Sequence, residues 1–500
     1  MEVSIDIKQK SQNKIALAAV CLSAIMLGLE ITSIPSILPT LEKILPANFK
    51  QLQWIMNAYT LAMCSTLIAM GALADRLGRK KVFMINIFAF GITSLICGLA
   101  TSTQLLIVAR FFQGISAAGM LACQVAILSW QFRNGPERGA AFAKWGVVFG
   151  LGLGFGPIIG GVIVDIFSWE WVFLIHVFIA ILTFIFAKSG VVEPSDPHVD
   201  SIDFAGIITL ALSVFGLVYL ITQGQGLGLN YTSSILVVSV ISFLLFILIE
   251  NKVSRPIFDF KIFRIRNFSG ALLGACGMNF SFWPFIIYLP IYLQNVLGYN
   301  SVMAGLIVLA YTLPTIVIPP YAERLFLKRG PKFVIPIGLF FISIGFILLH
   351  FVVKTEYASG ITLLPGCLLA GVGLGLTNTP VTNTTTSSLP PERAGMASGM
   401  EFSARVISLA VNIAIMGFIL VKGVSYYLTN TLSQDMLKNG VSSLADTIAA
   451  GNLAATDASG ISIITTYDAL IHGFGWVTFY GAIAPFVLGV IALFVFSSKK

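Results

Sequence analysis

Charged residues are scarce in this chain of 500 residues: they make up 10% of it, against roughly 25% in an ordinary soluble domain. There is no Cys-x-x-Cys pair, the four histidines are scattered, and no carboxylates cluster at ligand spacing. We therefore expect neither a metal site nor a disulfide framework. The phosphate-binding pattern G-x-x-x-x-G-K-[ST] is also absent, which argues against direct use of ATP.

Apolar residues are abundant instead. Hydrophobic residues make up 57% of the chain, and the six cysteines all lie inside apolar segments, as buried thiols do. The hydropathy predicts fourteen membrane-spanning helices with mostly short connections. These spans lie near residues 15–38, 52–73, 82–100, 104–130, 140–164, 170–187, 203–223, 233–250, 268–294, 302–321, 333–353, 360–386, 395–421 and 474–496.

Basic residues are distributed unevenly between the connections. Most of the 30 lysines and arginines fall in every second connecting segment and at the two ends of the chain. Because Lys and Arg accumulate on the cytoplasmic side of membrane proteins, we expect both termini in the cytoplasm. The membrane thus explains the net charge of +8, and we expect no nucleic-acid partner.

The predicted spans repeat as two halves of six helices. In each half a short basic loop follows the second helix, at residues 71–81 and 323–332. Parallel repeats of this kind are typical of transporters whose binding site lies between the halves. A channel would need symmetric oligomer helices and a filter segment, and the sequence shows neither. The expected division is an N-terminal half at 1–187, two inserted helices with linkers at 188–267, and a C-terminal half at 268–500 with an extracytoplasmic loop at 422–473.

An acidic residue, Glu30, lies within the first apolar run. Counting about 1.5 Å per residue from Lys14 places it roughly 24 Å along the helix, inside the hydrocarbon core. An ionised carboxylate at that depth is costly unless it titrates or pairs. Two interpretations stay open: a proton or cation site, or a carboxylate held by a donor on a neighbouring helix.

The loop at 71–81 carries a specific pattern, G-x-L-x-D-R-x-G-R-K-K. It resembles the signature between helices two and three of the major facilitator superfamily, and the chain is most similar to the fourteen-helix drug:proton antiporter branch. The resemblance covers nearly the whole chain and is weakest at 422–473. It implies an all-α polytopic membrane protein with the major facilitator fold.

In that family the loop holds the cytoplasmic side closed in the outward-open state. A simple basic anchor on the cytoplasmic face is the alternative. The resemblance assigns this gate to Gly71, Asp75, Arg76, Gly78 and Arg79.

The fourth span is similar to the family's helix-four motif at Arg110, Gln113 and Gly114. The resemblance implies that Arg110, with Glu30, couples proton movement to transport. A fixed pairing with Asp75 or with backbone carbonyls is the alternative, since an arginine at membrane depth needs a partner or an aqueous cavity.

The fifth span resembles the antiporter motif of this branch. Glycines four apart let helices approach closely, and a proline bends the helix. Ala143 stands where the family pattern has a further glycine, so the match is incomplete. The matching residues are Gly152, Gly156, Pro157, Gly160 and Gly161.

The chain also departs from the branch. Aspartate is usual at Glu30, and at the start of span six Glu170 replaces a base while His176 replaces an asparagine. His176 is either a second titrating group or a hydrogen-bonded histidine, because imidazole changes charge near neutral pH. Glu401 and Arg405 are spaced i, i+4, which predicts an intrahelical ion pair and leaves a role in lining the cavity open.

Aromatic residues give the one indication of substrate. Phe282, Trp283 and Tyr288 lie near an expected helix break in span nine, where stacking and cation–π attraction would suit lipophilic cations. Phenylalanine is abundant in this chain, with 39 residues, so ordinary packing is the alternative.

The resemblance implies a proton-coupled exporter of small hydrophobic or cationic compounds, of the multidrug efflux type, that works by alternating access. We expect a monomer in the lipid bilayer of a bacterial inner membrane, with the proton as coupling ion, no other cofactor and no enzymatic activity. A periplasmic adaptor is left open as a partner. The alternatives are a dedicated metabolite or siderophore carrier of the same fold, including in the uptake direction, and a membrane sensor that does not transport.

Overall fold

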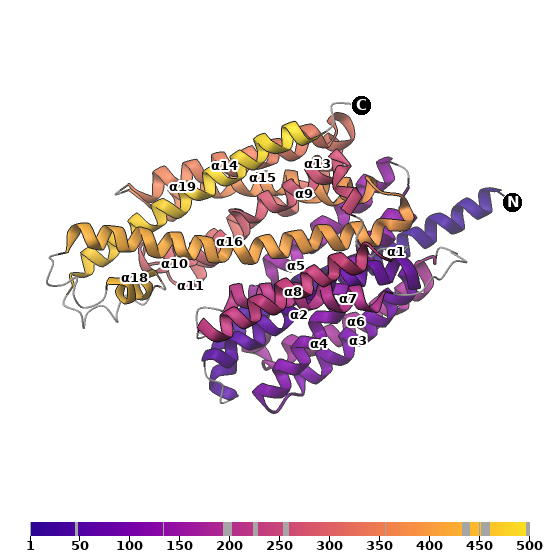
Figure 1. Ribbon diagram of the computed structural model, residues 1–500, viewed down its shortest axis with the longest axis horizontal. Coiled ribbons are helices and arrows are strands. Elements are labelled where there is room, and N and C mark those ends of the chain that lie inside the picture. The colour runs from indigo at the N-terminus through magenta and orange to yellow at the C-terminus, as the bar shows by residue number, and fades with distance from the viewer. Residues whose placement is uncertain are drawn as a thin grey trace. The chain divides into compact units, whose positions relative to one another are not determined.

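The computed structural model describes most of the chain as helix, and in the described residues it contains no strand (Figure 1). The described residues are 2–45, 49–133, 135–193, 203–223, 229–253, 260–355, 357–432, 441–449, 451 and 461–496. The chain divides into two compact units. Unit 1 comprises Met1–Ser269 and Thr382–Ile407, and unit 2 comprises Gly270–Val381 and Ser408–Lys500.

Unit 1 is a helical bundle in which α1 packs against α5 and α6, α2 against α4 and α7, and α3 against α4 and α6. The pair α7 and α8 also packs together. Its elements are α1 (Glu2–Ile44), α2 (Phe49–Leu77), α3 (Arg79–Gly98), α4 (Thr103–Gln131), α5 (Gly135–Ile166), α6 (Glu170–Gly190), α7 (Phe204–Gln223), α8 (Leu229–Glu250), η2 (Phe260–Arg264) and η3 (Pro391–Arg393).

Unit 2 contains most of the remaining helices, and α14 packs against α19 along much of its length. The end of α15 and the start of α16 belong to unit 1, and the rest of both helices to unit 2. The elements are α9 (Arg266–Asn279), α10 (Phe282–Asn295), α11 (Ser301–Thr312), α12 (Pro314–Val317), α13 (Pro319–Arg329), α14 (Pro331–Val353), α15 (Gly360–Ser387), α16 (Ala394–Thr431), α18 (Val441–Ala449) and α19 (Ile463–Val495).

The expected polytopic architecture is confirmed. In the described part of the chain, 12 helices are long and apolar enough to cross a membrane, or 13 if the bent pair Met303–Val317 and Pro319–Arg329 forms one span. Phe204–Leu220 is a shorter apolar helix. The number fourteen therefore stays a prediction, as does the division at residues 187 and 267.

The expected break in span nine is present between α9 and α10. Pro284 lies in the first turn of α10, where a proline removes no hydrogen bond from the helix. Asn279, the last residue of α9, is buried and donates to the Ala275 carbonyl and to Ser408 Oγ. The side chains at the break are thus held by hydrogen bonds within unit 2.

The stretch 422–473 is more helical than expected. One small helix was expected there and α18 is present, but α16 continues to Thr431 and α19 begins at Ile463. The expectation of a loop over the whole stretch was wrong at both ends. α16 continues because Leu420, Val424 and Leu428 recur every four residues and are buried in the core of unit 2.

Small residues set the distances between the helices of unit 1. Gly114 on α4 lies against the backbone of α2, and a Cβ built there would be 2.2 Å from the Tyr59 carbonyl oxygen. Ala117 and Ala118 follow on the same helix and are fully buried. Close packing of α2 and α4 therefore depends on glycine at position 114.

We predict that Gly114→Ala destabilises the protein and that Gly161→Ala does not. The first variant forces α2 and α4 apart, at a cost of about 1–3 kcal/mol. A Cβ at Gly161 meets nothing within 4 Å, so this variant is a matched control within a neighbouring span. Thermal unfolding of both purified variants in one detergent measures the difference, and equal midpoints would contradict it.

Candidate functional site

Glu30 and Arg110 form an ion pair inside unit 1. Glu30 on α1 is fully buried and Arg110 on α4 is 2% exposed, and Arg110 Nη1 pairs with Glu30 Oε1. The same guanidinium donates from Nε to the Ile55 carbonyl at 3.1 Å and from Nη1 to Gln113 Oε1 at 2.7 Å. The structure thus brings together the two residues that the sequence assigned to proton coupling.

Other helices extend this pair into a network. Gln113 Nε2 donates to Ser94 Oγ on α3 at 2.9 Å. The Arg110 guanidinium lies over the ring of Tyr59 on α2, 4.4 Å from its centroid, and 5.9 Å from that of Phe173 on α6. Aromatic faces stabilise a cation that has lost its water.

His176 on α6 completes the site. It is 1% exposed, and its Nδ1 lies 3.4 Å from Glu30 Oε2. The ring nitrogens also contact two carbonyl oxygens, Nδ1 that of Val172 at 3.0 Å and Nε2 that of Met26 at 3.2 Å. We call Glu30, Arg110, Gln113 and His176 the Glu30 cluster.

The Glu30 cluster has one feature that suits proton exchange. Within the described part of the chain, Glu30 Oε1 is held by Arg110 while Oε2 accepts no hydrogen bond. A buried carboxylate oxygen without a donor is costly, and taking up a proton removes that cost. The arrangement combines a fixed cationic partner with an acceptor position that is available for a proton.

A second buried network lies about two helical turns before Glu30 on α1. Trp145 Nε1 donates to Gln124 Oε1 at 2.9 Å, and Gln124 Nε2 donates to Ser23 Oγ at 2.7 Å. These three residues join α5, α4 and α1. The sequence analysis missed them, because a single Gln or Ser in an apolar run does not show which helix it faces.

The loop between α2 and α3 is tied to the start of α16 within unit 1. Asp75 Oδ1 accepts from the Gly395 backbone N–H at 2.9 Å and Oδ2 from that of Met396 at 2.7 Å. A carboxylate is stabilised there by the free N–H groups and the dipole of a helix N-terminus. Arg79 holds the same carboxylate, with Nη2 2.9 Å from Oδ1, and also donates to the Pro391 carbonyl.

Glycines permit this contact. Gly78 has φ +100°, a conformation that favours glycine, and it lets the chain turn from α2 into α3. A Cβ at Gly71 would lie 2.3 Å from the Gly395 carbonyl oxygen, so the two backbones touch. Arg76 is half-buried. All five residues of the loop motif thus lie at or beside one junction, whose partners were not predicted from the sequence.

Arg138, at the start of α5, forms a clamp that the sequence analysis missed. Its Nε donates to Asn383 Oδ1 and its Nη2 to Thr386 Oγ1, both at 2.7 Å, and both partners belong to the part of α15 in unit 1. Nη1 donates to the Ser129 carbonyl of α4 at 3.2 Å. Nothing near Arg138 in the sequence indicates this contact, because the two partners on α15 lie 245 and 248 residues away.

Glu401 and Arg405 form the ion pair that their spacing predicted. Thr382 joins them: its Oγ1 donates to Glu401 Oε2 at 3.3 Å and accepts from Arg405 Nη2 at 2.9 Å. Glu401 is fully buried, and the Arg405 side chain is 13% exposed. Thr382 thus ties the end of α15 to α16.

The helix-five glycines lie mainly against α1. A Cβ at Gly152 would lie 2.8 Å from the Ile25 carbonyl oxygen, and one at Gly156 would lie 1.9 Å from Thr32 Oγ1. Gly160 is also buried. Gly161 faces open space and has no such contact, and the side chain of Pro157 lies outside the described residues.

The aromatic residues expected near a cavity are largely part of the core of unit 2. Phe282 is fully buried and stacks on Tyr311, with centroids 4.1 Å apart. Trp283 is half-buried and contacts Phe282 edge-on. Tyr288 donates to the Ile413 carbonyl at 2.7 Å. For Phe282 the alternative of ordinary packing is the better description.

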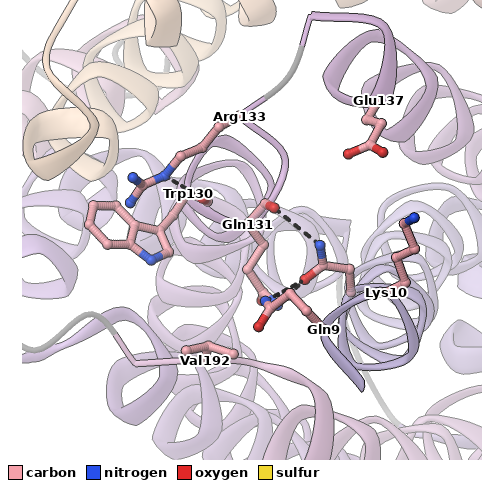
Figure 2. Close-up of a pocket in the computed structure, with 8 residues that line it drawn as sticks. Gln9, Lys10, Trp130, Gln131, Arg133, Glu137 and Val192 are labelled. Carbon is pink, nitrogen blue, oxygen red and sulfur yellow. Dashed lines mark hydrogen bonds between the residues drawn. The ribbon is translucent and has the colours of Figure 1, made fainter. Parts of the chain in front are cut away.

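A polar pocket of about 480 Å³ lies at the N-terminal end of α1 (Figure 2). Asn13 and Gln131 cross it with reciprocal hydrogen bonds, and Arg133 lies 4.0 Å from the ring centroid of Trp130. Glu30 is roughly 25 Å further along α1 from Asn13. The pocket is therefore separate from the Glu30 cluster. It is lined by Gln9, Lys10, Asn13, Trp130, Gln131, Arg133, Glu137 and Val192.

A set of apolar helices this long, with a buried acid–arginine pair among them, is typical of a polytopic membrane transport protein. The sequence profile of the Major Facilitator Superfamily matches residues 20–413, and the chain belongs to that family. It is therefore a transporter and not an enzyme.

The relatives that the chain resembles are named for different activities. The chain is 28% identical over 408 residues to the multidrug resistance protein Stp of Mycobacterium tuberculosis (strain CDC 1551 / Oshkosh), covering 81% of this chain and 75% of Stp. It is also 28% identical over 417 residues to the riboflavin transporter RibZ of Clostridioides difficile (strain 630), covering 83% of this chain and 90% of RibZ. The human organic anion transporter MFSD10 (TETRAN) has the same fold, with a TM-score of 0.64, 14% identity, and coverage of 97% of this chain and 99% of that one.

We predict that Asp75→Asn exposes the loop between α2 and α3. An amide offers one acceptor oxygen in place of two and loses the charge that attracts Arg79 and the α16 N-terminus. Losing hydrogen bonds to a charged group costs roughly 1.5–3 kcal/mol each, so trypsin should cleave at residues 79–81 at least about tenfold faster. The initial cleavage rate measures this.

Asp165→Asn is the matched control, since Asp165 is exposed at the end of α5. It should be cleaved at the wild-type rate. Equal rates for Asp75→Asn and wild type would show that the Asp75 contacts do not hold the loop.

Proposed function

We propose that the protein is a proton-coupled exporter of small hydrophobic or cationic compounds that works by alternating access. The observation that carries the proposal is the Glu30 cluster, a fully buried carboxylate with one oxygen held by Arg110 and the other accepting no hydrogen bond from any described residue. A carboxylate at membrane depth is retained mainly where it titrates or pairs. Glu30 does both in the proposed cycle.

Glu30 takes up a proton from the outer side and releases it inward as substrate leaves. Protonation removes the charge that holds Arg110, while the hydrogen bonds of Arg110 to Ile55 and Gln113 remain. The contact of α1 with α4 is then weakened and that of α4 with α2 is kept. The proton thereby changes which helices are held together.

The contacts of Asp75 and Arg79 support a gate on the cytoplasmic side, with both termini on that side. The membrane potential supplies enough energy, since one charge moved through 100 mV is worth about 2.3 kcal/mol. We further propose that the protein acts as a monomer in a bacterial inner membrane. The multidrug resistance protein Stp is the relative that supports export of drug-like compounds.

A dedicated metabolite or siderophore carrier is the second candidate, in either direction. The riboflavin transporter RibZ, which aligns with 83% of this chain, favours it. Because relatives of equal identity are named for multidrug resistance and for riboflavin transport, the test must include both kinds of compound.

The test uses everted membrane vesicles with an acidic interior and a fluorescent pH indicator. Tetraphenylphosphonium, ethidium and riboflavin are added in turn, and proton efflux is followed. We predict efflux with the lipophilic cations for wild type, and for Glu30→Gln the rate of vesicles without the protein, because an amide cannot carry the proton.

Glu137→Gln is the control, since Glu137 is exposed and lies far from Glu30 along the chain. It should behave as wild type. Glu30→Gln vesicles that exchange cations for protons as fast as wild type would reject Glu30 as the proton site. A response to riboflavin alone would favour the dedicated carrier.

A further inference from the structure

We infer that His176 is a second proton-carrying residue of the transporter and that it passes a proton from Nδ1 to Glu30 Oε2. The inference rests on the proposed function and adds to it a residue that Glu30 and Arg110 do not account for. Its basis is the position of the His176 ring among three oxygen atoms.

Both ring nitrogens of His176 face acceptors. Nδ1 lies 3.0 Å from the Val172 carbonyl oxygen and 3.4 Å from Glu30 Oε2, and Nε2 lies 3.2 Å from the Met26 carbonyl oxygen. A backbone carbonyl cannot donate a hydrogen. A neutral imidazole has one N–H and one lone pair, so in either tautomer one nitrogen would direct its lone pair at an oxygen. The imidazolium form, with two N–H groups, satisfies both sides of the ring.

The Glu30 carboxylate is the counterpart of this cation. Among the described residues no group donates a hydrogen bond to its Oε2, which is the oxygen on the side of His176. Arg110 occupies the other oxygen, so the carboxylate lies between two cationic groups. Glu30 Oε2, which can accept a hydrogen bond, and the Nδ1–H of the His176 imidazolium are therefore complementary.

The transfer balances in atoms and in charge. The Nδ1–H bond of His176 breaks and an O–H bond forms at Glu30 Oε2, giving neutral imidazole and neutral carboxylic acid. The new O–H can donate back to the Nδ1 lone pair, so the pair stays hydrogen-bonded. The net charge of the cluster, with Arg110, is unchanged, which matters because moving net charge in a low-dielectric interior is costly. The ion pair that holds Arg110 is lost in the same step.

The surroundings of the ring contain few other groups that titrate. Phe90 on α3 covers one side of the ring, with centroids 6.0 Å apart. Tyr59 on α2 and Cys97 on α3 belong to the same polar region through Arg110 and Gln113. Glu170 lies on α6 more than one turn before His176, and α5 carries Asp165 at its far end, where it is exposed. Glu30, paired with Arg110, is therefore the charged group in contact with the ring.

The first test reads the protonation of His176 directly and needs no substrate. The full-length protein, with ¹⁵N in its histidine rings, is reconstituted in lipid nanodiscs, and the ring-nitrogen resonances are recorded at pH 7.5. The resonance that disappears in His176→Asn belongs to His176, and His472→Asn controls for indirect loss of signal. We expect a doubly protonated His176 in wild type. In Glu30→Gln we expect the imidazolium signal to fall at least about tenfold, because the anion beside it is gone.

The second test separates proton relay from a structural role. Proton efflux driven by tetraphenylphosphonium is measured in everted vesicles between pH 6 and pH 8. We expect the wild-type rate to vary with pH over this range, and His176→Asn to exchange at a rate that varies less than about twofold over it. His176→Asn keeps a hydrogen-bonding side chain, and a thermal unfolding curve like that of wild type shows that it is folded.

The outcomes distinguish this inference from the proposed function. A neutral His176 in wild type at pH 7.5, or an unchanged pH profile in His176→Asn, would overturn the relay while leaving Glu30 as the proton site. Absence of proton exchange in wild type with every compound tested would overturn the proposed function. The resonances of wild type and Glu30→Gln would still decide whether His176 and Glu30 share a proton.

Discussion

The helical bundle of unit 1 depends on the buried ion pair between Glu30 and Arg110. Either charge is less stable at that depth without the other, because an isolated ion in a low-dielectric medium is far less stable than in water. Arg110 reaches α1 through Glu30 and α2 through the Ile55 carbonyl, and Gln113 carries the contact to α3. With His176 on α6, five helices meet at one polar site. Separating these helices at the site would require a charge or a proton to move.

The need of a buried charged group for a partner also explains other contacts in unit 1. Asp75 is stabilised by the backbone N–H groups of Gly395 and Met396, where a helix begins and those groups have no other acceptor. Arg138 is satisfied by a backbone carbonyl of α4 and by a side chain of α15. Glycine at positions 71 and 114 allows the backbones to come close enough for these bonds to form. Polar contacts and small residues thus act together: the first specify which helices meet, and the second let them meet.

Much of this arrangement was predictable from the sequence, for physical reasons that differ between residues. The helices follow from apolar runs, and the pair Glu401–Arg405 follows from its i, i+4 spacing. The acid at Glu30 was identified as a membrane-depth carboxylate, and its partner Arg110 by resemblance to a family motif.

Contacts between residues far apart in the sequence could not be predicted from it. The partners of Asp75 are backbone groups about 320 residues away. Every residue except proline has a backbone N–H, so no residue type in the sequence identifies the N–H that binds Asp75. The sequence likewise does not show that His176 faces Glu30, because the rotation of α6 about its axis is set by its packing against the neighbouring helices. The extension of α16 beyond residue 421 was missed because its polar residues hid the buried stripe at Leu420, Val424 and Leu428.

The most direct test of the central role of this ion pair is a double-mutant cycle in unfolding free energy with Glu30→Gln, Arg110→Gln and the variant that carries both. Removing one partner leaves the other charge buried, which costs about 3–5 kcal/mol, whereas removing both leaves no unpaired charge. The expected result is a double variant at least as stable as either single variant. Losses that simply add would show that Glu30 and Arg110 act independently, and would contradict the view that their pairing organises the bundle.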